Sequence, residues 1–134
     1  MRKILLDTNA YVRFLRGDEK VMTYLAQADS VCVSVFVLGE LYAGFRAGGK
    51  ERNNRQILER FLLKPTVTVL EATIETADIF GLIMASLKKS GNPIPINDLW
   101  IAAHALETGS ILLTYDHHFA VVPGLRLWDE FSLP

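Results

Sequence analysis

The chain has 134 residues, a length at which one domain can bury a substantial core, so we expect a single domain over residues 1–134. Half of the residues are hydrophobic and the formal net charge is −1, which indicates a well-packed globular protein and excludes a strongly basic one. A single cysteine excludes an internal disulfide, and the apolar runs are too short for a signal peptide or a membrane span, so a cytoplasmic location is expected.

The hydrophobic pattern alternates between strand and helix along the chain. Short apolar runs predict strands at residues 3–6, 31–34, 66–70, 111–114 and 125–128. Helical spacing predicts helices at residues 9–15, 20–28, 35–45, 50–63, 73–88 and 97–108. Continuously apolar strands separated by helices are typical of a parallel sheet that is covered on both faces. The predicted fold is therefore α/β, a three-layer α/β/α sandwich with a mostly parallel sheet of four or five strands.

Four acidic residues stand at the ends of strands or the beginnings of helices. Asp7 follows the first strand, and Asp116 follows the strand at 111–114. Glu40 lies early in the helix after the second strand, and Asp98 opens the helix at 97–108. In a parallel α/β sheet these positions meet at one edge, where ligands and catalytic groups collect. The four carboxylates are therefore expected to lie close together.

Carboxylates that share a pocket need a cation. Two unit charges about 5 Å apart repel by roughly 3 kcal/mol at an effective dielectric constant of 20, which corresponds to about two pKa units. A group of oxygen ligands suits Mg²⁺ or Mn²⁺. The sequence thus predicts a site for Mg²⁺ or Mn²⁺ at the sheet edge.

Each acid also has an ordinary structural explanation. Asp7 and Asp116 can be turn formers, Asp98 can complement a helix dipole, and Glu40 can be a solvated helix residue. Two observations favour a functional role. Asp7 follows an apolar strand with no polar spacer, and both Glu40 and Asp98 interrupt segments that are otherwise apolar.

Four sequence blocks, at residues 4–9, 34–41, 96–105 and 113–119, resemble a PIN-domain ribonuclease, most closely a VapC-type toxin of a toxin–antitoxin pair. The resemblance covers essentially the whole chain and implies metal-dependent hydrolysis of RNA phosphodiester bonds. It assigns the catalytic and metal-binding positions to Asp7, Glu40, Asp98 and Asp116, and small polar positions near the metal to Thr8, Asn9 and Thr114. It also implies a small antitoxin partner and a homodimer.

The three histidines do not show the spacing of a zinc metalloprotease. His104 is expected to be a packed or capping group. His117 and His118 stand where some PIN nucleases have a further acid, and we expect them to be solvated loop residues, outside the metal site, with RNA contact as the alternative.

Three other functions compete. An aspartyl phosphatase of the haloacid-dehalogenase type also begins with an apolar strand ending in aspartate, but its general acid would stand at Asn9. A phosphoacceptor receiver domain would need an acidic pair after the first strand and a late lysine, which Asp7-Thr8 and Thr114-Tyr115-Asp116 do not supply. A PIN fold that only binds RNA or protein is the third alternative, and four acids argue against it.

Overall fold

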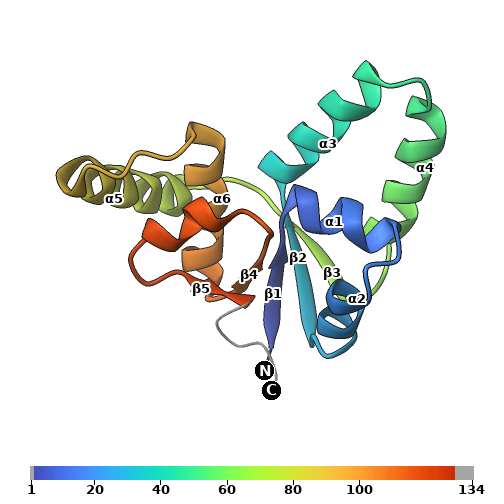
Figure 1. Ribbon diagram of the computed structural model, residues 1–134, viewed down its shortest axis with the longest axis horizontal. Helices are drawn as coiled ribbons and strands as arrows, with labels where there is room; N and C mark the ends of the chain where they lie inside the picture. Colours follow the sequence, from blue (N-terminus) through green and yellow to red (C-terminus); the bar gives the residue numbers. More distant parts are fainter. Residues whose placement is uncertain (1, 129–134) are drawn as a thin grey trace.

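The computed structural model describes residues 2–128 and contains a five-stranded sheet at its centre (Figure 1). The strand order is β3-β2-β1-β4-β5, and all neighbouring strands in the described part of the chain pair in parallel. The strands are β1 (Lys3–Leu6), β2 (Ser30–Ser34), β3 (Val67–Leu70), β4 (Ile111–Leu113) and β5 (Arg126–Leu127). This arrangement confirms the predicted parallel α/β sheet.

Helices lie on both sides of these strands. Figure 1 shows one group on one side, α1 (Thr8–Leu15), α2 (Glu19–Ala26), α3 (Val35–Ala47) and α4 (Glu51–Leu62), and a second group on the other side, α5 (Ile74–Ser90) and α6 (Ile96–Thr108). The strand order explains this division. The chain moves outward from β1 to β3 and then crosses back to β4 on the other side of β1, and right-handed crossovers in opposite directions cover opposite faces.

The reversal of strand order falls between β1 and β4. Such a point leaves a crevice outside the carboxyl ends of the two strands, and ligands bind there in open α/β sheets. The two strands stay in register up to their ends, since Leu6 pairs with Leu113 and the Asp7 amide donates to the Leu113 carbonyl at 3.0 Å. The residues that follow, Asp7 and Thr114, therefore enter the crevice side by side.

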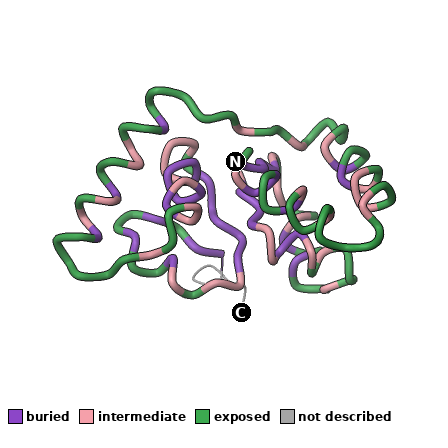
Figure 2. The backbone as a smooth tube through the Cα atoms, turned by 90° about the horizontal axis from the view of Figure 1, so that it is seen from above, coloured by how far each residue is buried: buried purple, intermediate pink, exposed green. Residues whose placement is uncertain are grey.

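The core is built on the central strands. Buried residues follow the strands and the inner faces of the helices, whereas the outer helices are largely exposed (Figure 2). Ile4, Leu5 and Leu6 of β1 are 1% exposed or less. Cys32 on β2 is a buried free thiol, as expected from its apolar surroundings.

The structure refines some of the predicted boundaries. The predicted strand at 111–114 ends at Leu113, so Thr114 is released from the ladder and its side chain enters the crevice. A short 3₁₀ helix, η1 (His117–Val121), follows Asp116 and was not predicted, because apolar periodicity cannot be seen in so few residues. None of the helices within residues 2–128 combines the length and apolar character that a bilayer crossing requires.

Candidate active site

Asp7 is the most buried of the four acids, with 4% of its surface exposed. It caps α1, where its Oδ1 accepts a hydrogen bond from the Thr8 amide at 2.9 Å. Its Oδ2 accepts from the Thr114 hydroxyl at 2.6 Å, and that hydroxyl in turn accepts from the Asp116 amide at 3.0 Å. One threonine thus ties the end of β1 to the turn that carries Asp116.

Burial has a strong effect on the charge of Asp7. The pKa of this carboxyl is raised from 3.8 to about 6, mainly because burial removes solvent, with a smaller contribution from the negative charges of Glu40 and Asp98. The hydrogen bonds from Thr114 and Thr8 oppose the rise. The direction agrees with the sequence-based expectation for acids that share a pocket, but the main cause is burial rather than mutual repulsion.

Glu40 reaches the same region from α3. Its side chain is exposed, and its Oε1 accepts a hydrogen bond from the Thr8 hydroxyl at 2.8 Å. Because the Thr8 amide binds Asp7 and the Thr8 hydroxyl binds Glu40, this residue orients two of the four acids. The other oxygen of Glu40, Oε2, remains open.

Asn9 has a structural task in this region. Its Oδ1 accepts a hydrogen bond from the Tyr115 amide at 3.1 Å, which fixes the turn after β4. The three small polar residues predicted near the metal, Thr8, Asn9 and Thr114, therefore all hold elements of the crevice in place.

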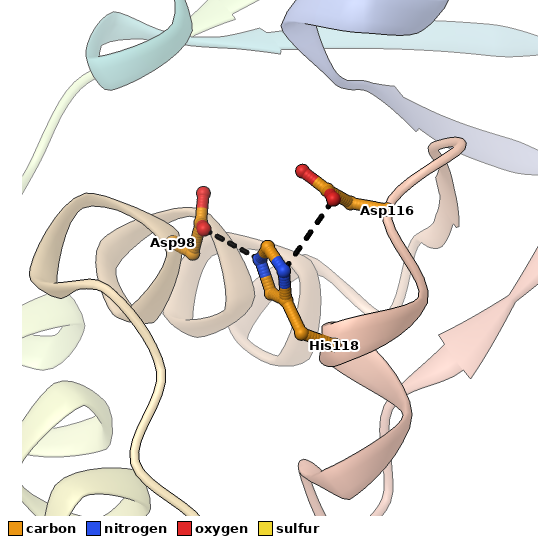
Figure 3. Close-up of side chains that lie close together, drawn as sticks. All are labelled: Asp98, Asp116 and His118. Atoms are coloured by element: carbon orange, nitrogen blue, oxygen red, sulfur yellow. Dashed lines mark hydrogen bonds and ion pairs between the residues drawn. The ribbon is translucent and has the colours of Figure 1, made fainter.

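Asp98 on α6 and Asp116 in the turn before η1 lie close together, and His118 lies between them (Figure 3). His118 Nε2 is 2.6 Å from Asp98 Oδ2, and His118 Nδ1 is 3.4 Å from Asp116 Oδ1. The Asp98 side chain is 14% exposed, and this burial raises the pKa of its carboxyl. The hydrogen bond with His118 lowers the pKa, and the negative charge of Asp116 raises it. Among residues 2–128, these three offer ligand atoms within 4.8 Å of one another. Asp7 and Glu40 lie beside this cluster rather than in it.

The expectation for the histidines was correct for His104 and wrong for His118. His104 is buried, with Nδ1 2.8 Å from the Ser34 hydroxyl and Nε2 3.1 Å from the Glu71 carbonyl. Since a carbonyl only accepts, Nε2 carries the proton and Ser34 donates to Nδ1. His118 is engaged with two acids instead of being a solvated loop residue, because η1 turns its side chain back toward α6. The position of His118 two residues after Asp116 was the feature of the sequence that could have indicated its place beside the acids.

Among residues 2–128, the one basic side chain within ion-pair distance of the four acids is His118, which lies beside Asp98 and Asp116. Within residues 2–128 no lysine or arginine forms an ion pair with any of the four acids, and the arginine ion pairs are made with Asp18 and Glu51. Asp7 is buried with only the neutral partners Thr8 and Thr114, and burying an ionised carboxylate without a counterion is unfavourable. The donors are carboxylate oxygens with one imidazole, so the residues present fit a divalent cation.

Known proteins resemble this chain along nearly its whole length. A relative named Ribonuclease VapC2, from Haemophilus influenzae, is 37% identical over 116 residues, covering 85% of this chain and 86% of the relative. Residues 4–125 match the family model described as PIN domain. The chain belongs to the PIN-domain family, in its VapC group.

Solved structures of VapC proteins agree. The DNA-bound VapBC complex of Salmonella typhimurium contains a chain that superposes with a TM-score of 0.84 at 28% identity, covering 95% of this chain and 97% of that one. For VapBC2 of Rickettsia felis bound to a promoter DNA fragment, the TM-score is 0.82 at 26% identity, and the match covers 93% of this chain and 96% of that one. A Salmonella typhimurium relative, 27% identical with 96% and 98% covered, is named tRNA(fMet)-specific endonuclease VapC. The PIN-like fold predicted for this chain is confirmed.

Proposed function

We propose that this PIN-domain protein is an endoribonuclease that depends on Mg²⁺ or Mn²⁺ and acts as the toxin of a toxin–antitoxin pair. The observation that carries the proposal is the cluster of Asp98, Asp116 and His118, with the buried Asp7 and the Thr8-bound Glu40 beside it. Within residues 2–128, no lysine or arginine forms an ion pair with these four acids. The ribonuclease names of the VapC relatives support the same activity.

The residues have separate tasks in this proposal. Asp7, Asp98 and Asp116 would hold the cation, with Asp7 and Asp98 as its direct ligands. Such a cation, when bound, lowers the pKa of water and neutralises charge on the phosphate. Thr114 keeps the Asp7 carboxylate and the Asp116 turn at a fixed separation through its two hydrogen bonds. Glu40, oriented by Thr8, accepts the proton of the attacking water at its open Oε2.

The aspartyl phosphatase is disfavoured by the role of Asn9. A phosphatase of that kind needs a general acid at this place, whereas the Asn9 side chain binds the Tyr115 amide and offers no acid. The relatives named ribonuclease point away from it as well. A PIN fold that only binds RNA or protein differs from the proposal in activity, so a cleavage assay separates them.

The test is cleavage of total RNA by the purified protein with Mg²⁺, with Mn²⁺ and with EDTA. Asp7→Asn, Asp98→Asn, Glu40→Gln and Asp116→Asn remove one charge each with little change of shape. Losing charge stabilisation of several kcal/mol should slow cleavage by roughly 10²–10³. Asp78→Asn is the matched control, because this exposed aspartate lies on α5, a helix that carries none of the four acids. Full cleavage in EDTA, or by folded Asp7→Asn protein, would overturn the mechanism.

The toxin role is a separate part of the proposal. The solved relatives are VapBC toxin–antitoxin complexes, which supports a small antitoxin partner for this chain in the cytoplasm. An antitoxin arginine that reaches the crevice would meet the unbalanced carboxylates. Expression of the chain alone should arrest growth, and co-expression of the neighbouring small reading frame should restore it. Unaffected growth would refute the toxin role and leave the nuclease proposal standing.

A further inference from the structure

His118 stands where three chain segments bring ligand atoms together. Asp98 comes from the first turn of α6, Asp116 from the turn after β4, and His118 from η1 (Figure 3). The imidazole lies between the two carboxylates, 2.6 Å from one and 3.4 Å from the other. Within residues 2–128, Asp98 Oδ1 and Asp116 Oδ2 form no hydrogen bond or ion pair, so these two oxygens are available to a cation.

The position of the imidazole is set by the core rather than by the acids alone. The next residue, Phe119, is fully buried and anchors η1 against the sheet. The His118 ring lies against the Phe119 ring, with 5.0 Å between centroids. At the other end of the turn, Trp128 Nε1 donates to the Thr114 carbonyl at 2.5 Å. A side chain held this way is already oriented for binding, so it loses little conformational freedom when a ligand arrives.

We propose that His118 is a nitrogen ligand of the cation bound by Asp98 and Asp116, and that it selects a divalent transition ion over Mg²⁺. This inference rests on the proposed metal-dependent function. Mg²⁺ takes oxygen ligands almost exclusively, whereas imidazole binds first-row transition ions. Mn²⁺, at the hard end of that series, accepts carboxylate oxygen and imidazole nitrogen together. A carboxylate at position 118 would give an all-oxygen site, which Mg²⁺ favours.

The experiment measures binding of Mn²⁺ alone to the full-length protein without RNA. Electron paramagnetic resonance reports the free Mn²⁺ concentration, and pulsed measurements on the bound ion detect a coordinated nitrogen. Mg²⁺ is then titrated as the competitor. The variants are His118→Ala and His118→Asp, with His117→Ala as matched control, because His117 is the adjacent histidine and is exposed. Thermal melts show that each variant is folded, and His118→Asp tests the inference if His118→Ala does not fold.

The wild type and His117→Ala should show nitrogen coupling to Mn²⁺, and both His118 variants should lose it. Even residues that only support a metal ligand commonly contribute roughly 10–100-fold to metal affinity. Because His118 is proposed to bind the ion directly, His118→Ala should weaken Mn²⁺ binding by about 10-fold or more. Mg²⁺ should displace Mn²⁺ from His118→Asp at a lower concentration than from the wild type. Saturable Mn²⁺ binding without nitrogen coupling in the wild type would overturn this inference alone. Absence of any Mn²⁺ or Mg²⁺ binding would overturn the proposed metal-dependent function as well.

Discussion

Replacing Asp7 by asparagine should stabilise the metal-free protein at neutral pH, although we expect it to abolish cleavage. Folding buries this carboxyl until 4% of its surface is exposed and raises its pKa from 3.8 to about 6. A shift of this size corresponds to about 3 kcal/mol of free energy of unfolding that is lost when the group is ionised. The active site therefore carries a cost in stability that the substitution removes.

The sign of the pH dependence follows from where the proton is released. Below about pH 4 the carboxyl is protonated in the folded and the unfolded chain, and it costs nothing. The unfolded chain releases the proton near pH 4 and the folded chain near pH 6, so stability falls as the pH rises through this interval. Well above pH 6, where the carboxyl is ionised in both states, the full loss of about 3 kcal/mol in the free energy of unfolding is reached. About 1.4 kcal/mol of it develops between pH 5 and pH 7.5.

A lost hydrogen bond reduces the stability that Asp7→Asn gains. An asparagine can still accept from the Thr8 amide, but its amide nitrogen replaces the oxygen that accepts from the Thr114 hydroxyl. A net loss of about 1 kcal/mol is usual for such a bond. Asp7→Asn should therefore be more stable than the wild type by about 2 kcal/mol at pH 7.5, which corresponds to a rise in Tm of about 5–10 °C.

The assay is denaturation by guanidinium chloride in EDTA, at pH 5 and pH 7.5, for the wild type, Asp7→Asn and Asp78→Asn. The exposed Asp78 is expected to change the free energy of unfolding by no more than about 0.5 kcal/mol at either pH. If Asp7→Asn is less stable than the wild type at both pH values, or if its advantage does not grow with pH, then burial of an ionised Asp7 is not the source of strain.

Three further predictions concern other parts of the molecule. Thr114→Val removes the hydroxyl that joins Asp7 to the Asp116 turn, so kcat/KM for RNA cleavage should fall by about 10-fold or more. An unchanged rate would remove Thr114 from the site. His104→Ala leaves a cavity and removes the acceptor of the Ser34 hydroxyl proton, so chemical denaturation should show a loss of about 3 kcal/mol in the free energy of unfolding, with Mn²⁺ affinity kept. We expect a homodimer, twice the 15.0 kDa chain by light scattering, with its interface on the helices predicted at 35–45 and 50–63. Leu63→Glu, at a side chain that is 81% exposed, should therefore shift it toward monomer, and an unchanged mass would count against this interface.

Much of the fold could be predicted because local physical signals agree with the tertiary arrangement. The apolar run at 3–6 and the helical spacing at 35–45 correspond to β1 and α3 within a few residues. Asp7, Glu40, Asp98 and Asp116 were found because strand ends and helix starts meet at one edge of any parallel sheet. That rule needs only the order of elements, which the hydrophobic pattern provides.

The role of His118 could not be predicted in this way. The segment after Asp116 is too short to show periodicity, so the 3₁₀ helix that turns the imidazole toward Asp98 was not recognised. His104 lies in an apolar helical segment, whereas His118 follows Asp116 and His117, and neither environment by itself shows what the imidazole contacts. One packs between Ser34 and Glu71, and the other lies between two carboxylates. Only the packing of Phe119 and the approach of α6 distinguish them.

The amino-acid sequence by itself determined the α/β class, the parallel sheet and the identity of the four acids, because these depend on hydrophobic periodicity and on the order of elements along the chain. Tertiary structure decided the charge state of Asp7, the hydrogen bonds that orient Glu40 and Asp116, and the approach of His118 to Asp98. These properties depend on burial and on distances of a few ångströms between residues far apart in the chain. Such quantities exist only after the crossover through α5 and α6 has placed β4 beside β1.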